Sequence, residues 1–344
     1  MVDGIFERIR PIPEVSSVSR DYFQNSVVSA HQPVVLRGLV DDWELVSRAR
    51  ESDKSLIRYL QKKTIPGPVK TVEAPRDSGG RYFYTSDLSG FNFRRVKTTF
   101  YEFSERLLRQ KGDPDAPVVS LQSAYTDDYF TDVHLENLMS LMDDSVRPRI
   151  WVGGKTIVAT HHDDAENIAC VAAGRRRFVL FPPEQISNLY IGPIDKTPSG
   201  APVSMVSLNE PDFDRFPRFR QALEHAQVAV LNPGDAIYIP ALWWHHVEAL
   251  DEINVLVNYW QGGAIGGARG AMPLDAMLLS MATLRDRSEP VRQAWKALFD
   301  FYLFGNDSEV AGHIPETARG FLDKSGEERL NQIRPWLLKQ LSEE

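Results

Sequence analysis

The chain has 344 residues, of which 42% are hydrophobic, so it can bury the core of one large domain or of two smaller ones. Its formal net charge of -8 argues against non-specific binding of DNA or RNA, which needs a broadly basic surface. The single cysteine, Cys170, excludes an intramolecular disulfide and a zinc site made of cysteines. Because no run resembles a signal peptide or a membrane span, we expect a cytoplasmic protein without a membrane partner.

The first part of the chain mixes strand and helix patterns. Residues 33–38 form an apolar run closed by a glycine, which indicates a buried strand. Asp41 and Asp42 then offer caps for a helix that reaches about Leu60. An amphipathic pattern predicts a second helix over Thr98–Lys111.

Between these helices, residues 74–93 contain two turn signals and two aromatic runs. This pattern predicts a hairpin. Its aromatic side chains either pack as a structural cluster or form a lid over the mouth of a pocket.

Short strand patterns become frequent between Pro117 and Trp260, with glycine and proline turns separating many of them. The expected strands are Val118–Gln122, Arg149–Gly153, Thr156–His161, Ile168–Ala173, Arg176–Phe181, Val203–Ser207, Ala226–Leu231, Ala236–Ile239, His245–Ala249 and Val255–Trp260. Because no helical pattern alternates with them, they favour a sandwich or barrel over a doubly wound sheet. We therefore expect a mainly β protein with flanking helices, built as a jelly roll whose mouth suits a small-molecule site.

After the glycine-rich break at 262–267 the pattern becomes helical. Helices are expected over Leu274–Arg285, Ser288–Phe304 and Ser325–Leu341, the last with a kink at Pro335. The apolar stripe of the second helix either packs on the same chain or forms the face of a homodimer.

These patterns predict three regions. Residues 1–116 form an N-terminal α/β segment that packs on the core, and residues 117–262 form the β core. Residues 263–344 form a C-terminal helical region.

His161 and Asp163 are two residues apart, so on an extended strand both side chains point to the same face. A turn and a strand lead to His245, which can add a second imidazole. Two histidines and one carboxylate are the ligand set of non-haem Fe(II) oxygenases, which leaves positions open for a co-substrate and O2. On spacing alone, the alternative stays open that these are unrelated residues of turns or core. His162 and His246 point the other way and are interpreted as packing or supporting residues.

A 2-oxo acid co-substrate needs a cation for its distal carboxylate, and arginine is the natural partner. Alternation places Arg176 on the face of Phe178 and Leu180, although a solvated start of a strand is the alternative. Asn167 and Asn258 are amides within apolar strands, so each needs a partner, either structural or a ligand.

Taken in order, these motifs resemble the cupin-like branch of the Jumonji-C Fe(II)/2-oxoglutarate dioxygenases, the branch of the asparaginyl hydroxylase that acts on hypoxia-inducible factor. The resemblance covers most of the chain and depends on residues 33–38 with Trp43, 82–84 with 87–88 and 90–93, 161–163 with Asn167, 174–178, 180–183, 233–235, 238–240, 243–246 and 258–260.

The resemblance implies a double-stranded β-helix in which His161, Asp163 and His245 hold Fe(II). It also implies that Asn167 and Asn258 lie near 2-oxoglutarate, and that the C-terminal helices form a homodimer.

Three positions depart from the family pattern. Arg176 stands where the family usually has a lysine that pairs with the distal carboxylate of 2-oxoglutarate. Val158 stands where relatives place a threonine that contacts the co-substrate, and Ser120 stands where the asparaginyl hydroxylase has a tyrosine. Ser120, Thr156 or Thr160 is expected to compensate.

These observations predict an Fe(II)- and 2-oxoglutarate-dependent dioxygenase that uses O2 to hydroxylate a protein side chain or a small molecule. One alternative is a cupin-fold protein that binds a metal or a small acid without oxidation, which the residues at 158 and 120 favour. A weaker one is a metal-dependent isomerase or hydrolase. The sequence leaves open the substrate and the choice between hydroxylation and demethylation.

Overall fold

Most of the expected strands are present and form two sheets. The computed structural model describes residues 3–267, 270–324 and 326–342. The five-stranded sheet has the order β1 (Arg10–Pro11), β11 (Gln227–Leu231), β10 (Arg176–Phe181), β13 (Trp244–Ala249) and β8 (Ile157–His161). The nine-stranded sheet has the order β2 (Glu14–Ser16), β3 (Val34–Arg37), β12 (Ala236–Ile239), β9 (Glu166–Ala173), β14 (Asn254–Gln261), β7 (Arg149–Gly153), β6 (Val118–Tyr125), β4 (Pro68–Ala74) and β5 (Arg94–Thr99).

The two sheets enclose an interior that the side-chain alternation of their strands defines. Along β9, Ala169 and Val171 join the interior cluster, while Ile168 and Cys170 belong to the core on the outer face. The interior cluster takes apolar side chains from both sheets, including Phe178, Leu180, Ala229, Leu231, Ile237, Ile239, Val247 and Leu256. The predicted jelly roll, mainly β with flanking helices, is confirmed.

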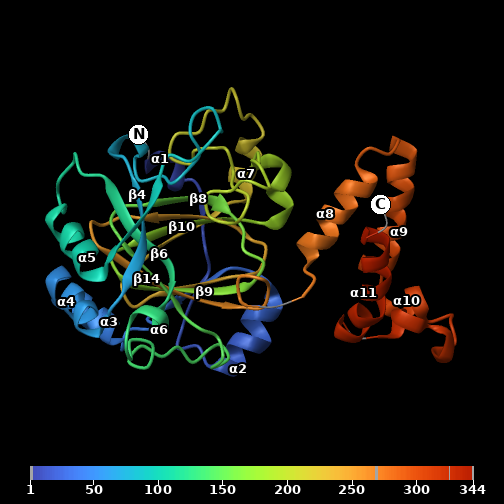
Figure 1. Cartoon of the computed structure of the whole chain (residues 1–344), viewed down its shortest axis with the longest axis horizontal. Helices are drawn as coiled ribbons and strands as arrows, with labels where there is room; N and C mark the ends of the chain where they lie inside the picture. Colours follow the sequence, from blue (N-terminus) through green and yellow to red (C-terminus); the bar gives the residue numbers. More distant parts are fainter. Residues whose placement is uncertain (1–2, 268–269, 325, 343–344) are drawn as a thin grey trace. The chain divides into compact units, whose positions relative to one another are not determined.

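Helices cover the outer faces (Figure 1). On the nine-stranded sheet, α3 (Glu44–Glu51) packs on β9, α5 (Phe100–Arg109) packs on β4 and β5, and α4 (Asp53–Lys63) lies against α3 and α5. On the five-stranded sheet, α1 (Asp3–Phe6) and α7 (Phe219–His225) pack against β10 and β13. Short elements complete this part of the chain, namely α2 (Arg20–Tyr22), a π-helix (Phe23–Val28), α6 (Thr126–Tyr129) and 3-10 turns at Arg76–Ser78 and Pro183–Asn188.

The chain divides into two units, Met1–Ala268 and Arg269–Glu344. The segment expected at 1–116 and the core expected at 117–262 share the nine-stranded sheet, because β4 and β5 extend it beyond β6. Each unit has its own helices.

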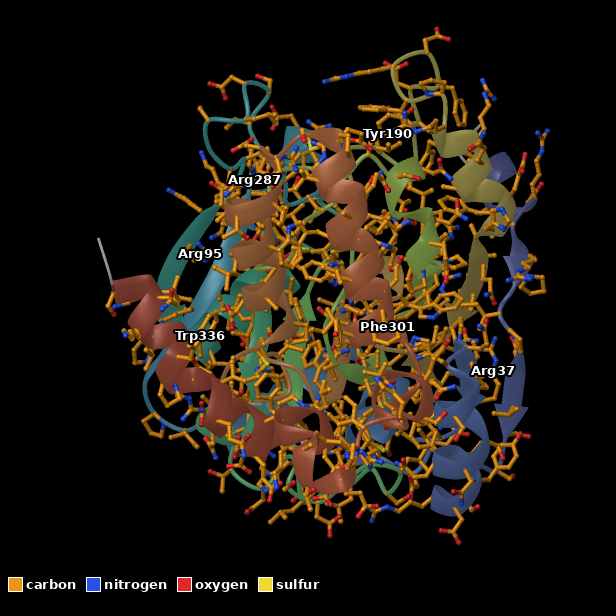
Figure 2. All side chains as sticks on the ribbon, turned by 90° about the vertical axis from the view of Figure 1, so that its right-hand side faces the viewer. Arg37, Arg95, Tyr190, Arg287, Phe301 and Trp336 are labelled. Carbon is orange, nitrogen blue, oxygen red and sulfur yellow. The ribbon has the colours of Figure 1, made fainter. Side chains whose placement is uncertain are left out.

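The second unit is helical, as predicted. Its elements are α8 (Pro273–Leu284), α9 (Glu289–Phe304), α10 (Asp307–Ala311), 3-10 turns at Glu316–Ala318 and Gly320–Asp323, and α11 (Gly326–Ser342). The expected start of the last helix, Ser325, lies outside the described residues. Figure 2 shows Phe301 on α9 and Trp336 on α11, which are 37% and 61% exposed. Among the described residues, no helix has the length and apolarity needed to cross a bilayer.

Two local predictions are wrong. The single helix expected from Asp41 to Leu60 is two helices, because Ser52 is extended at φ -178° and caps α4. The expected strand Val203–Ser207 forms only isolated bridges, from Val203 to His161 and from Ser204 to Ile191.

The hairpin expected over residues 74–93 is present in short form. Tyr84 and Phe91 form an antiparallel bridge, with backbone hydrogen bonds from Thr85 to the Gly90 carbonyl at 3.0 Å and from Asn92 to the Phe83 carbonyl at 2.9 Å. The aromatic cluster itself is present: Phe91 stacks on Phe93 with ring centroids 5.2 Å apart, and Tyr82 meets Phe93 edge-on. The regular strands lie on either side of the loop, in β4 and β5.

Candidate metal centre

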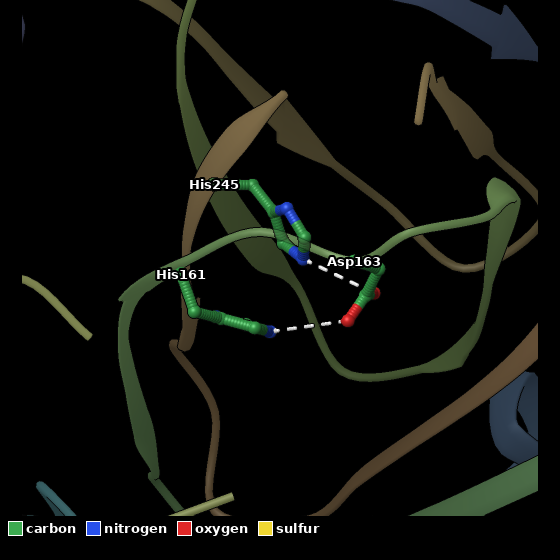
Figure 3. Close-up of side chains that lie close together, drawn as sticks. All are labelled: His161, Asp163 and His245. Atoms are coloured by element: carbon green, nitrogen blue, oxygen red, sulfur yellow. Dashed lines mark ion pairs between the residues drawn. The ribbon is translucent and has the colours of Figure 1, made fainter. Parts of the chain in front are cut away.

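Three side chains with metal-binding atoms converge where β8 ends and β13 begins (Figure 3). His161 is the last residue of β8 and pairs with His245 in β13, so the two imidazoles are cross-strand neighbours. Asp163 Oδ1 lies 3.9 Å from His161 Nε2, and Asp163 Oδ2 lies 3.6 Å from His245 Nε2. One donor atom of each residue lies within 4.8 Å of the other two. Such separations suit one ion with bonds of about 2.1 Å.

Both imidazoles are oriented by backbone carbonyls. His161 Nδ1 lies 2.9 Å from the carbonyl oxygen of Ala159, and His245 Nδ1 lies 3.0 Å from that of Trp243. Because a carbonyl can only accept, each Nδ1 carries the proton and each Nε2 keeps its lone pair. The two Nε2 atoms are the ones that face Asp163, as metal coordination requires.

The carboxylate of Asp163 is also held in place. Trp260 Nε1 donates to Asp163 Oδ2 at 3.0 Å, and the backbone N–H of Leu242 donates to the Asp163 carbonyl at 2.8 Å. Oδ1 is left for other partners.

Burial favours the neutral form of the second imidazole. The pKa of His245 is lowered to about 4, first because burial disfavours the imidazolium and then because His161 lies beside it. A neutral histidine is the form that binds a metal.

The two neighbouring histidines lie outside this cluster. His246 Nε2 lies 2.9 Å from Glu248 Oε1, and Arg177 Nη1 donates to Glu248 Oε2 at 2.8 Å, on the outer face of the five-stranded sheet. His162 packs edge-on against Trp244 with ring centroids 4.7 Å apart. Their predicted packing role agrees with these contacts.

Arg176 brings a buried positive charge into the interior between the sheets. It is 5% exposed and precedes Phe178 and Leu180 on the inward face of β10. Among the described residues nothing forms a side-chain hydrogen bond or ion pair with Arg176, and its Nε is a buried nitrogen without a partner. Burial lowers the pKa of Arg176 to about 10, so the guanidinium stays charged at neutral pH. A cation left in this state is a site for an anion.

The two predicted asparagines contact each other. Asn258 Nδ2 donates to Asn167 Oδ1 at 2.9 Å, while Asn258 Oδ1 is buried and has no partner among the described residues. Each amide therefore makes one side-chain hydrogen bond and still has polar atoms that can form hydrogen bonds with a ligand.

The remaining predicted residues differ in how they relate to this interior. Ser120 is buried, and its hydroxyl lies 2.8 Å from the Tyr82 hydroxyl. Thr160 is buried beside His161, and its backbone carbonyl accepts from Ser204, yet no side-chain hydrogen bond of Thr160 occurs within the part of the chain that is described. Val158 packs on the interior apolar cluster.

Sequence reasoning assigned no individual contact to three residues near the interior, although it placed Tyr82 within the aromatic segment expected to form a cluster or a lid. They are Tyr82, Trp151, whose indole nitrogen is buried without a partner in the described chain, and Trp260. The alternation of Trp151 with the outward Ile150 and Val152 was a usable signal. Tyr82 contacts Ser120, which is distant from it in the sequence, so no local sequence pattern indicated this contact.

Comparison with known proteins adds independent evidence. The family model described as a cupin-like domain matches residues 20–261. Over 266 residues the chain is 27% identical to a lysine-specific demethylase, JMJ31, of Arabidopsis thaliana, covering 69% of this chain and 47% of the relative. Over 254 residues it is 26% identical to lysine-specific demethylase 8 of Xenopus tropicalis, covering 72% and 52%. A shorter match, 36% over 113 residues, is to human HSPB1-associated protein 1, covering 32% and 22%.

The chain thus spans about half the length, or less, of these curated relatives. The matched region of the family model contains both sheets from β3 to β14 and all three residues of the metal cluster. The chain therefore belongs to the cupin-like domain family, in the Jumonji-C class that its ordered motifs resemble.

Proposed function

We propose that the chain is an Fe(II)- and 2-oxoglutarate-dependent dioxygenase whose iron ligands are His161, Asp163 and His245. The observation that carries the proposal is the convergence of two Nε2 lone pairs and one carboxylate, with both Nδ1 atoms engaged by carbonyls. Three protein ligands on one side of an ion leave room for a chelating co-substrate and O2.

The other interior residues fit the co-substrate. Arg176 offers a buried, unpaired guanidinium for the distal carboxylate of 2-oxoglutarate, four residues along β10 from Leu180, which pairs with His245. Four residues span about 13 Å along the strand. The arginine side chain and an extended five-carbon acid can together cover this distance between Arg176 and the metal site. Asn167 and Asn258 offer amide groups beside the same interior. Ser120 and Thr160 remain candidates for compensating the valine at position 158.

A bound iron would supply the activation of O2, coupled to oxidative decarboxylation of 2-oxoglutarate to succinate and to insertion of one oxygen atom into a substrate C–H bond. The chain's own part is to hold and orient the reactants. The carbonyls of Ala159 and Trp243 fix the imidazoles, Trp260 fixes the carboxylate, and the apolar interior excludes water.

For the substrate we infer a side chain of a protein. The support is that two relatives matched over most of the chain are named lysine-specific demethylases. Hydroxylation of a C–H bond is the basic reaction, and demethylation follows when the hydroxylated carbon is an N-methyl group. The aromatic segment from Tyr82 to Phe93 would line the approach of the substrate.

The test uses purified protein loaded anaerobically with Fe(II). We expect 2-oxoglutarate to bind only when metal is present, and succinate to form when O2 is admitted, slowly without substrate and faster with one. Tight binding of the acid without succinate under any substrate screen would instead support a non-oxidising binding protein. Turnover with Zn(II) or Mn(II) that needs no O2 would support an isomerase or hydrolase.

We also propose that the helical unit forms a homodimer. Apolar side chains of α8 and α9 remain exposed, including Leu274, Met277, Leu278, Trp295 and Leu298. A hollow of about 490 Å³ between these helices is lined by Thr283, Leu284, Arg287, Val291, Trp295 and Phe299. Exposed apolar surface of this kind favours association. Light scattering should give twice the mass of the chain, and a Leu298→Asp variant should give the monomer.

For the compartment we propose the cytoplasm. The support is a single cysteine that is fully buried and free, which suits a reducing compartment. A fluorescent fusion of the full chain tests this location.

A further inference from the structure

The loop before β5 sends one tyrosine into the interior. Tyr82 is 6% exposed, and its hydroxyl lies 2.8 Å from the hydroxyl of Ser120 on β6. Because Val119 and Leu121 belong to the outer core, Ser120 faces inward, and the phenol meets it from that side. Gly153 pairs with Ser120, and a Cβ at that glycine would lie 2.7 Å from Ser120 Cβ. A side chain at position 153 would therefore collide with Ser120, so the glycine makes room for the serine.

A pair of hydroxyls has two protons but needs only one of them for its own hydrogen bond. The other proton is free to be donated to an anion. Burial raises the pKa of Tyr82 far above its ordinary value, so the phenol is a neutral donor at physiological pH. A neutral donor does not repel a carboxylate.

The pairing of the strands places this donor opposite Arg176. Arg81 bridges Ile157, Ile157 pairs with Glu248, and Glu248 pairs with Arg177, so these four residues form one row that runs from beyond the edge strand β8 across β13 to the central strand β10. Tyr82 follows this row at its Arg81 end, and Arg176 precedes it at its Arg177 end.

This row spans three strand spacings of about 4.8 Å each, and the two flanking residues are about 7 Å apart along the strands. Tyr82 and Arg176 are both long side chains that enter the interior. Across this separation they can hold one carboxylate between them.

We propose that Tyr82 is a co-substrate-binding residue, whose hydroxyl pair with Ser120 donates to the distal carboxylate that Arg176 neutralises. This inference rests on the proposed function and extends it. It accounts for the serine at position 120: the phenol that the asparaginyl hydroxylase has on this strand is supplied here by the preceding loop. Within the loop, Tyr82 is then the residue that belongs to the co-substrate site.

The experiment compares two 2-oxo acids by calorimetry on metal-loaded, anaerobic protein. 2-Oxoglutarate has a distal carboxylate and pyruvate has none. We expect Tyr82→Phe to weaken 2-oxoglutarate binding about tenfold, the usual loss for one hydrogen bond to a charged group, and to leave pyruvate and metal affinity unchanged. Ser120→Ala tests the same pair without altering the loop, should the phenylalanine variant fold poorly.

Tyr84→Phe is the matched control. Tyr84 is equally buried in the same loop, but its hydroxyl donates to the carbonyl of Lys196 at 2.6 Å. We expect it to leave both affinities unchanged. Equal losses for both acids, or none in either variant, would overturn the role of Tyr82 while the proposed function stands. A wild-type protein that binds metal but not 2-oxoglutarate would overturn both.

Discussion

The indole N–H of Trp260 donates to Asp163 Oδ2 at 3.0 Å, on the same carboxylate that faces both histidines. Trp260 lies on β14 of the nine-stranded sheet, whereas His245 lies on β13 of the five-stranded sheet. Asp163 lies in the loop that follows β8 of the five-stranded sheet. This hydrogen bond therefore holds that loop against β14 of the nine-stranded sheet. It orients the carboxylate before any ion arrives.

Replacing Trp260 with phenylalanine removes this donor and keeps the ring. We expect metal affinity to fall about tenfold, the low end of what is lost when the group that orients a metal ligand is removed. Calorimetric titration with Mn(II) measures this. Trp43→Phe is the control, because Trp43 is also buried and donates to the Leu138 carbonyl at 2.8 Å, far along the chain from the cluster. Equal losses in both variants would mean that the Trp260 effect is only structural.

Replacing Arg176 with methionine should have opposite effects on binding and on stability. The guanidinium has no partner among the described residues and is buried at an energetic cost, so we expect the metal-free variant to gain about 1–3 kcal/mol in the free energy of unfolding. Its affinity for 2-oxoglutarate should be lost, and Arg176→Lys should retain part of it because the charge remains. Urea unfolding and calorimetry give the two quantities.

Arg175→Met serves as the control for that experiment. Arg175 is exposed and pairs with Asp251 at 2.8 Å, so its replacement should leave both the affinity and the free energy of unfolding unchanged. A destabilised Arg176→Met variant that still binds the acid would contradict the assignment.

A carboxylate far from the metal cluster should make stability depend on pH. Glu73 on β4 is bonded by Arg106 of α5 at 2.8 Å and by Arg94 of β5 at 3.1 Å. The hydrogen bond from Arg106 is the main reason why the pKa of Glu73 is lowered. Because the folded state prefers the ionised form, this stabilisation is complete above the unfolded pKa and is lost as pH falls through the folded pKa.

We therefore expect Glu73→Gln to reduce the free energy of unfolding by about 1 kcal/mol at pH 7, and by much less at pH 3. Glu210→Gln, at an exposed position, should change stability at neither pH. A Glu73→Gln difference that stays constant between these two pH values would contradict this role.

Removing the helical unit should leave the β unit intact. The first unit contains both sheets and their covering helices, and α8 to α11 contribute no strand to it. We expect a chain of residues 1–267 to unfold in a single cooperative transition, to bind metal with unchanged affinity and to be monomeric by light scattering. Loss of metal binding with the fold retained would show that the helical unit takes part in the site.

The strands of the core were predictable because their burial follows a simple pattern. Residues 168–173, 178–181 and 255–257 are apolar throughout, as strands covered on both faces must be. The metal cluster was predictable from residue spacing. His161 and Asp163 are two residues apart near the end of a strand, so their side chains point in the same direction.

Other elements lacked such a pattern. β5 has the sequence RRVKTT with a single apolar residue, because it lies at the edge of its sheet and pairs only with β4. Residues 203–207 look like a strand, yet their apolar side chains fill clusters beside Tyr84 and Phe219 while the backbone makes only isolated bridges. The contact of Tyr82 with Ser120 joins residues 38 positions apart and depends on the fold alone.

The most direct test of the account is the metal stoichiometry of the purified protein and its Asp163→Ala variant, measured anaerobically with Fe(II). The variant removes one ligand and leaves both histidines in place. We predict one ion per chain for the wild type, with metal-dependent binding of 2-oxoglutarate, and loss of both in the variant without a change in fold. An equally tight single ion in the variant would contradict the cluster as the metal site, and with it the oxygenase proposal.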